Sequence, residues 1–139
     1  MPSVTDLRDR VREWLHREPR QVTPRTILIV DGDGASREST ARRVEALGYQ
    51  SLFATGIAEA LDRLEDQNPE FVLLGFDLAD TGGLDALKQI RQIDPEVPVI
   101  MLATDLWDAR VPEAMRQGAV AYLARPFGLD DLREVLGRR

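Results

Sequence analysis

The chain has 139 residues with no cysteine, one histidine (His16), 18 basic and 24 acidic side chains. These counts favour one domain that buries its own core in a reducing cytoplasm, exclude disulfides and thiolate zinc sites, and leave little scope for imidazole catalysis. The formal net charge of −6 argues against direct binding of nucleic acid, which requires clustered Lys and Arg, and favours protein partners.

Residues 1–24 are predicted to form an appended amphipathic helix followed by a linker that Pro19 and Pro24 bracket. Within residues 3–18, apolar side chains at alternating steps of three and four share one stripe: Val4, Leu7, Val11, Trp14 and Leu15. Because an isolated helix of this length is marginally stable in water, the stripe needs a surface to cover it. Three alternatives stay open: docking on the chain's own domain, docking on a partner, and homodimerisation.

The sequence shows no feature that would direct the chain into or across a membrane. The N-terminus carries acidic residues and lacks the apolar stretch of a signal peptide. No apolar segment approaches the roughly 20 residues that span a bilayer. We therefore expect a cytoplasmic protein that does not bind membranes.

Residues 25–139 are predicted to form one α/β domain, in which short apolar runs alternate with amphipathic helical segments. The predicted strands are residues 27–30, 49–54, 71–76, 97–103 and 119–123, and the predicted helices are residues 36–47, 57–66, 84–93, 109–117 and 129–136. Ser36 and Thr55 are expected N-caps, and Gly48 and Gly118 stand where a left-handed residue ends a helix. Five βα units in a row indicate a parallel sheet with helices on both faces.

In such a sheet, functional residues gather at the carboxyl ends of the strands. The candidates there are Asp31, Gly32, Asp33, Gly75, Asp77, Ala103, Thr104, Arg125 and Pro126. Three carboxylates from two strands could converge on Mg²⁺, and the alternative is a polar rim on the sheet. Spacing excludes a phosphate loop, a dinucleotide fingerprint and a calcium loop, because Arg37 stands in place of a third glycine and Arg42 in place of the calcium-binding glutamate.

Four motifs between Thr26 and Gly137 carry a family resemblance: ILIVDGD, FVLLGFDLADTGGLDALKQIR, VPVIMLAT and GAVAYLARPF. They are similar to the receiver domain of bacterial two-component response regulators, and they cover nearly the entire domain. The resemblance implies a five-stranded parallel doubly wound (βα)5 flavodoxin-like sheet, here with an extra N-terminal helix.

The resemblance also implies a phosphorylation chemistry that this sequence lacks. In the family, an aspartate after the third strand accepts a phosphoryl group from a histidine kinase, helped by Mg²⁺, a hydroxyl and a lysine. The corresponding residues here are Gly75 for the acceptor, Ala103 for the hydroxyl and Arg125 for the lysine, while Gly32 replaces one acid of the metal-binding pair. Glycine has no side chain, so no acyl phosphate can form at Gly75.

We therefore expect a degenerate pseudo-receiver: a non-catalytic, phosphorylation-independent module for protein–protein interaction in bacterial signal transduction, with no cofactor. Trp107 and Tyr122 are the expected contact residues, on the face of the fourth helix, fifth strand and fifth helix, although both could instead be partly buried in their own domain. A homodimer would form through this face or through the N-terminal helix.

Two alternative functions and one structural expectation complete the prediction. Asp77 could accept a phosphoryl group in a rearranged Mg²⁺ site with Asp31 and Asp33, if the third strand continued far enough to point it at them. The chain could also be the regulatory domain of a longer transcription factor. Finally, Arg125 is expected to pair with Asp31 or Asp33, because clustered carboxylates without a metal ion would otherwise repel one another.

Overall fold

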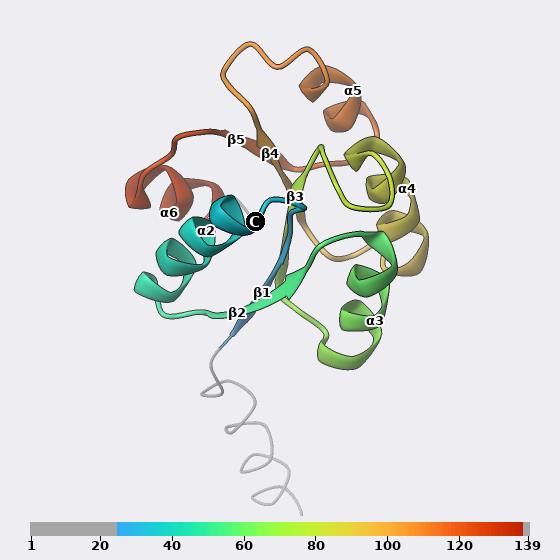
Figure 1. Cartoon of the computed structure of the whole chain (residues 1–139), viewed down its shortest axis with the longest axis horizontal. Helices are drawn as coiled ribbons and strands as arrows, with labels where there is room; N and C mark the ends of the chain where they lie inside the picture. The colour runs from blue at the N-terminus through green and yellow to red at the C-terminus, as the bar shows by residue number, and fades with distance from the viewer. Residues whose placement is uncertain (1–24, 138–139) are drawn as a thin grey trace, which may run out of the picture.

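The computed structural model describes residues 25–137, in which five parallel strands form a sheet between two layers of helices (Figure 1). The strand order is β2-β1-β3-β4-β5, which is the predicted doubly wound arrangement. The strands are β1 (Thr26–Val30), β2 (Gln50–Ala54), β3 (Phe71–Gly75), β4 (Val99–Ala103) and β5 (Ala121–Ala124), and the helices are α2 (Gly34–Ala46), α3 (Ile57–Gln67), α4 (Gly83–Ile93), α5 (Val111–Arg116) and α6 (Leu129–Gly137). The helix predicted in residues 3–18, with its stripe, lies outside the described residues.

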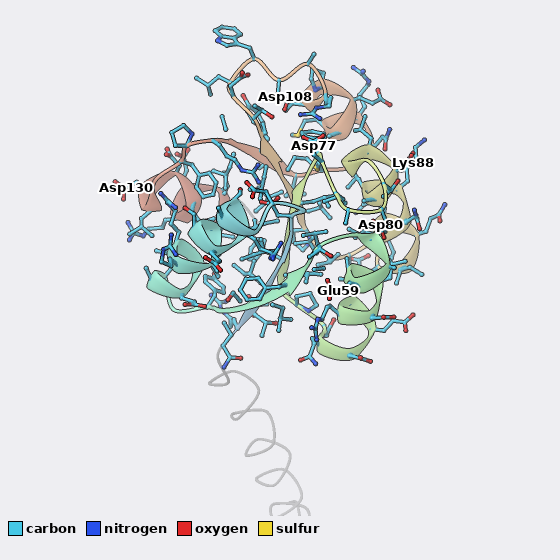
Figure 2. All side chains as sticks on the ribbon, in the orientation of Figure 1. Glu59, Asp77, Asp80, Lys88, Asp108 and Asp130 are labelled. Atoms are coloured by element: carbon cyan, nitrogen blue, oxygen red, sulfur yellow. The ribbon has the colours of Figure 1, made fainter. Side chains whose placement is uncertain are left out.

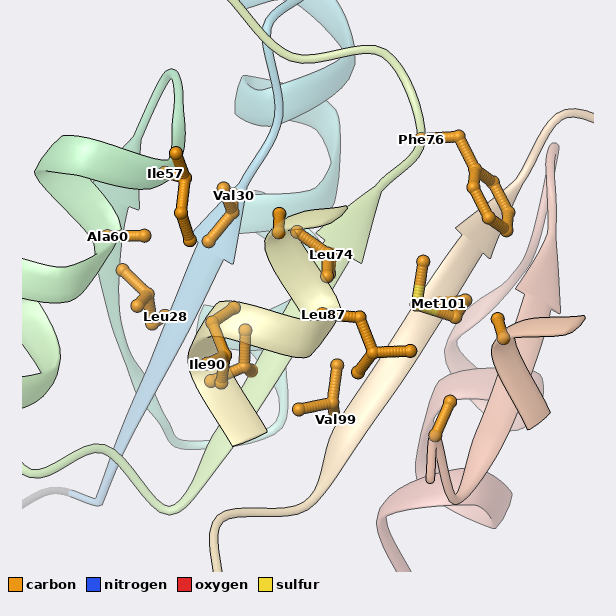
Figure 3. Packing of buried hydrophobic residues seen from close by; sticks show 14 of the residues in the cluster. Leu28, Val30, Ile57, Ala60, Leu74, Phe76, Leu87, Ile90, Val99 and Met101 are labelled. Atoms are coloured by element: carbon orange, nitrogen blue, oxygen red, sulfur yellow. The ribbon is translucent and has the colours of Figure 1, made fainter. Parts of the chain in front are cut away.

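The apolar runs predicted as strands supply the centre of the molecule, and the sheet divides the core into two layers. Helices α2 and α6 cover one face, and α3, α4 and α5 cover the other (Figure 1). Successive strand residues face opposite sides, so that Leu28 packs towards α3 and α4 while Ile29 packs towards α2 and α6. Figure 3 shows Leu87 and Ile90 of α4 lying over the sheet on the face that α3, α4 and α5 cover. Burial on both faces explains why β1, β3 and β4 are almost continuously apolar.

The register of the strands determines which loops meet at the carboxyl edge of the sheet. Val30 pairs with Leu74 across β1 and β3, so the residues that follow them, Asp31 and Gly75, lie side by side. Ala103 pairs with Ala124 across β4 and β5, which brings Thr104 next to Arg125. The edge residues predicted from the sequence are therefore gathered at one end of β1, β3, β4 and β5.

Two predicted helix ends are confirmed and two predicted N-caps are wrong. Gly48 and Gly118 have positive φ angles, +92° and +109°, which a glycine adopts without steric cost after a helix. The N-cap of α2 is Asp33 rather than Ser36, because its carboxylate accepts a hydrogen bond from the Ala35 backbone N–H at 3.3 Å.

Helix α3 is capped by a residue from another loop, which no local pattern reveals. Gly56 is its N-cap instead of the predicted Thr55, and it provides no side-chain hydrogen bond. The carboxylate of Asp80, in the loop after β3, accepts hydrogen bonds from the backbone N–H groups of Ile57 at 2.8 Å and Ala58 at 3.2 Å. These amides hold the pKa of the Asp80 carboxyl group below its usual value.

Several element boundaries differ from the prediction by one to two residues, and two of these differences affect the site. Strand β3 ends at Gly75, not at Phe76, so the strand does not continue towards Asp77. Helix α5 begins at Val111 rather than at residue 109. The preceding turn is instead held by Asp108, whose carboxylate accepts hydrogen bonds from the backbone N–H groups of Thr104 at 3.0 Å and Arg110 at 3.1 Å.

Candidate functional site

A buried ion pair lies at the carboxyl edge of the sheet, where β1 and β5 deliver their last residues. Asp31 is only 3% exposed, and its Oδ2 atom accepts a hydrogen bond from Nη2 of Arg125 at 2.8 Å. Its Oδ1 atom accepts a hydrogen bond from the backbone N–H of Asp33 at 3.0 Å. The predicted pairing of Arg125 is thus confirmed, with Asp31 as the acid. Charge-assisted hydrogen bonds of this length are among the stronger ones in proteins.

Gly75 lies directly beside this ion pair. A Cβ atom built on Gly75 would meet the carbonyl oxygen of Val30 at 3.4 Å, and both Nη2 of Arg125 and Cγ of Asp31 at 3.8 Å. These are ordinary van der Waals distances, so the backbone leaves room for a side chain that would point at the pair. Gly75, which stands where the receiver family has its phosphoacceptor, therefore faces the Asp31–Arg125 ion pair, but it contributes no nucleophile.

Gly32 is in a tighter position than Gly75. A Cβ atom built on Gly32 would lie 2.8 Å from the backbone oxygen of Asp77 and 3.3 Å from Cα of Leu78. The loop after β3 therefore packs against Gly32 in the space that a side chain would need. The receiver family has an acid of its metal-binding pair at this position, and here the neighbouring backbone leaves no room for an acidic side chain.

The three carboxylates proposed as weak metal ligands do not converge. Asp31 is paired with Arg125, and the carboxylate of Asp33 caps α2. The Asp77 side chain is 86% exposed and lies 3.3 Å from Nη1 of Arg110. Within residues 25–137, no group of three His, Cys, Asp or Glu side chains is arranged to hold a metal ion. The alternative of a convergent site is wrong because β3 ends before Asp77, and these residues do not fit the Mg²⁺ site implied by the resemblance.

Arg110 joins the two loops that follow β3 and β4, and sequence analysis missed it. Its Nε and Nη2 atoms donate to the two carboxylate oxygens of Asp108, each at 3.0 Å. Its guanidinium lies 4.4 Å from the ring centre of Phe76, and Nη1 reaches Asp77. Figure 2 shows Asp77 and Asp108 close together at this edge of the molecule. Asp77 and Asp108 are far apart in sequence, so the role of Arg110 can be recognised only once folding brings the two loops together.

The electrostatics of this cluster favour its ionised state. Hydrogen bonds from the Arg110 side chain and from the backbone N–H groups of Thr104 and Arg110 outweigh the burial of the carboxylate, which would raise its pKa, and leave the pKa of Asp108 far below its usual value. Asp108 in turn raises the pKa of Arg110. The hydroxyl group of Thr104 accepts a further hydrogen bond from Nη2 of Arg110 at 3.3 Å. The hydroxyl nearest to the site is therefore engaged by an arginine, while Ala103 before it has none.

The two aromatic contact candidates are exposed and lie along one groove. Trp107 is 88% exposed, its neighbour Leu106 is 69% exposed, and Tyr122 on β5 is 38% exposed. Residues of the β4–α5 loop, β5 and α6 line a groove of about 620 Å³ that includes all three side chains. Trp107 lies in the loop before α5, near the start of that helix as expected. The alternative of partial burial is wrong for Trp107, and Tyr122 is at the boundary between half-buried and exposed.

No helix within the described residues is long and apolar enough to cross a membrane. The N-terminal contact candidates Val4, Leu7, Val11 and Trp14 lie outside those residues. The expectations about the N-terminal helix therefore stay predictions.

Comparison with known proteins identifies the family to which this domain is similar. A family model described as "Response regulator receiver domain" matches residues 27–137. The chain is 36% identical over 110 residues to the "Response regulator MprA" of Mycobacterium sp. (strain KMS), covering 78% of this chain and 47% of that protein. It is 31% identical over 115 residues to the "Acid tolerance regulatory protein ActR" of Rhizobium meliloti (strain 1021), covering 83% and 59%. The chain thus spans about half the length of these curated relatives.

A solved structure gives the same result in three dimensions. The crystal structure of the receiver domain of NtrX from Brucella abortus matches with a TM-score of 0.73 at 29% identity, covering 81% of this chain and 95% of that chain. The match spans nearly all of that receiver domain, in agreement with the strand order β2-β1-β3-β4-β5 observed here.

Proposed function

The chain belongs to the response regulator receiver domain family, and from that premise we propose that it acts as a pseudo-receiver. It is a non-catalytic module that binds a protein partner in a two-component signalling pathway without being phosphorylated. The observation that carries this proposal is Gly75, which faces the Asp31–Arg125 ion pair at the acceptor position. A phosphoryl group needs a nucleophilic side chain to form a covalent bond, and glycine supplies none.

The surroundings of Gly75 support the same conclusion. Receivers use a metal ion to neutralise charge on the transferred group, and this kind of support is usually a large part of the rate enhancement. Here Asp31 is neutralised by Arg125, and the backbone of Asp77 fills the space beside Gly32. An aspartate restored at Gly75 alone would therefore lie beside a carboxylate that Arg125 already pairs, and the loop after β3 leaves no room for an acid at Gly32.

Without a covalent trigger, a partner must supply the energy for any change of state. A binding partner shifts a conformational equilibrium only by its difference in affinity for the two states. The groove that contains Trp107, Leu106 and Tyr122 is the surface proposed for that contact, because exposed aromatic residues are over-represented among residues that dominate binding energy. In a longer transcription factor, the same groove would face another domain of that chain.

Phosphorylation is tested by incubating the full chain with Mg²⁺ and acetyl phosphate and measuring its intact mass. We expect no added phosphoryl group, and the same result for Asp77→Asn. An added mass that disappears in Asp77→Asn would overturn the proposal and establish the alternative phosphoacceptor, since Asp77 is accessible to solvent. A receiver that retains its acceptor aspartate provides the positive control.

The interaction surface is tested by affinity capture from the source cell with the unchanged chain and three variants. Trp107→Ala and Tyr122→Ala are expected to lose partners that the unchanged chain retains. Phe53→Ala is the matched control, because Phe53 is an aromatic residue on β2 with 39% exposure, close to the 38% of Tyr122. Equal loss of partners from Tyr122→Ala and Phe53→Ala would refute the assignment of the groove.

The proposed role of residues 1–24 in homodimerisation requires a separate measurement. Sizing the full chain beside residues 25–139 compares the two directly. If the full chain is a dimer and the shorter chain a monomer, the N-terminal segment carries the contact. If both are dimers, the described domain carries it, and if both are monomers neither proposed dimer exists.

A further inference from the structure

A second cavity lies between the start of α2, the end of β4 and the turn after β5. Its volume is about 430 Å³, within the range of roughly 300–1,000 Å³ that is common for small-molecule sites. Its lining combines four hydroxyl groups, two guanidinium groups and an apolar wall: Ser36, Ser39, Thr40, Thr104, Arg43, Arg125, Pro126 and Phe127. No carboxylate belongs to the lining, although the chain has 24 acidic residues and a net charge of −6. The cavity is therefore lined by hydroxyl groups and by two guanidinium groups, of which that of Arg125 is also paired with Asp31.

Two of its polar groups form no hydrogen bond within the described part of the chain, and one of them, Nε of Arg125, is a buried atom. The Thr40 side chain lines the cavity at 2% exposure, and no hydrogen bond to its hydroxyl is formed by the described residues. The Nε atom of Arg125 is buried and also has no acceptor, because the ion pair with Asp31 uses Nη2. Buried polar groups in native proteins are almost always satisfied, so unpaired groups around one cavity call for a ligand or water that satisfies them.

Arg43 provides a positive charge that no carboxylate of the described residues neutralises. Its Nη1 atom donates to the backbone oxygen and to the hydroxyl of Ser39, and its guanidinium lies 5.6 Å from the ring centre of Phe127. These contacts fix the side chain at the wall of the cavity, and none of them is with an anion. The guanidinium group keeps further N–H donors in its planar fork, a geometry that matches phosphate oxygens.

From these observations we propose that the cavity binds a small organic phosphate ester without covalent transfer. The phosphate group is held by the guanidinium groups of Arg43 and Arg125 and by the hydroxyl of Thr40, and the apolar body of the ligand lies against Pro126 and Phe127. Gly75 does not line this cavity, so the site does not include the phosphoacceptor position of the family, although it shares Arg125 with the ion pair beside Gly75. The inference goes beyond the proposed interaction function and does not depend on it, since a ligand can bind here whether or not a protein partner does.

The test titrates the ¹⁵N-labelled full chain with phenyl phosphate, inorganic phosphate and benzyl alcohol while recording amide chemical shifts. Phenyl phosphate is expected to cause saturable shifts at the amides of residues 36–43, 104, 125, 127 and 128, and to bind more tightly than inorganic phosphate because it also contacts the apolar wall. Benzyl alcohol has the ring without the charge, and it is expected to bind at least about tenfold more weakly than phenyl phosphate.

Three variants assign the binding to the named side chains. Arg43→Gln removes the charge and Thr40→Val removes the hydroxyl with little change in shape, and each is expected to weaken phenyl phosphate, Arg43→Gln by about tenfold. Arg63→Gln is the matched control, because Arg63 is an exposed arginine on α3, which covers the opposite face of the sheet, and does not line the cavity. Its affinity is expected to be unchanged.

Three results would overturn the proposal. The first is the absence of saturable shifts at the named amides with either phosphate probe. The second is equal affinity for phenyl phosphate and benzyl alcohol, which would indicate an apolar site that does not select an anion. The third is equal weakening by Arg43→Gln and Arg63→Gln, or an unchanged affinity in Thr40→Val. Retained dispersion of the amide spectrum shows in each case that the variant is folded.

Discussion

Replacing Arg125 with alanine removes one partner of the Asp31 ion pair and leaves a carboxylate that is almost completely buried. Removing one member of a fully buried pair typically costs about 3–5 kcal/mol, whereas an exposed pair contributes about 0–1 kcal/mol. The Asp31 side chain is 4% exposed and the Arg125 side chain 31% exposed, so this pair is intermediate. Asp31 also keeps the hydrogen bond from the Asp33 backbone N–H. We therefore expect Arg125→Ala to lower the free energy of unfolding by about 1–3 kcal/mol.

The assay is urea-induced unfolding of the full chain, with thermal unfolding beside it. For a domain of this size, a loss of about 2 kcal/mol corresponds to a fall in Tm of about 5–10 °C. Arg42→Ala is the control, because Arg42 is an exposed arginine on α2 with the same change in charge and no ion pair to a described residue. Equal losses for Arg125→Ala and Arg42→Ala would refute the view that the Asp31–Arg125 ion pair stabilises this edge of the sheet.

A double-mutant cycle separates the ion pair from the packing of the long arginine side chain. Asp31→Asn keeps an acceptor for the Asp33 N–H, and Arg125→Met keeps much of the side-chain volume. We expect the double variant to lose less stability than the sum of the two single variants, by about 1–2 kcal/mol, because the charges are then removed together. A coupling energy indistinguishable from zero would mean that the 2.8 Å contact contributes little to stability.

Three other substitutions test contacts elsewhere in the domain. Asp80→Ala should speed amide hydrogen exchange at the first turn of α3 at neutral pH. The pKa of Asp80 is lowered in the folded state, so its stabilisation is present above the ordinary pKa of 3.8 and is lost as the pH falls below that value. An equal effect of the substitution at acidic and neutral pH would contradict the cap. Arg110→Ala should cost about 1 kcal/mol, a discounted value because the arginine side chain is 38% exposed, and should increase exchange in residues 104–110, whereas unchanged exchange there would show that Asp108 holds the turn alone. Leu73→Ala, at a fully buried position of β3, should cost about 2–5 kcal/mol in urea unfolding, clearly more than Phe53→Ala at a 39% exposed position of β2, and a reversed order would contradict the assigned burial.

The two arginines that hold the carboxyl edge of the sheet act in different ways. Arg125 is sequestered with Asp31 beneath the position of Gly75. Arg110 lies nearer the surface and connects the loop after β3 with the loop after β4 through Asp77 and Asp108. Guanidinium groups thus make two of the connections at this edge of the sheet.

The fold, and the glycine at the position where the resemblance implies the acceptor, were determined by the sequence by itself, because both depend on local features. Apolar runs that are buried on both faces, alternating with amphipathic segments, indicate a parallel sheet whatever its exact boundaries. A missing side chain at Gly75 excludes an acyl phosphate there in any arrangement of the neighbours. The pairing of Arg125 with an acid also followed from the sequence, since both residues end strands that must meet at one edge.

Only the tertiary structure decided how the loops at that edge are connected. The alternative in which Asp77 points at Asp31 or Asp33 required β3 to continue, but β3 ends at Gly75 and the exposed carboxylate contacts Arg110 instead. The cap of α3 comes from Asp80, in a loop 22 to 23 residues further along the chain. The path of a loop is set by contacts with whatever elements pack beside it, so a pattern of neighbouring residues carries no record of it. The same reason explains why the cavity between α2 and the turn after β5 could be recognised only once the helices were packed on the sheet.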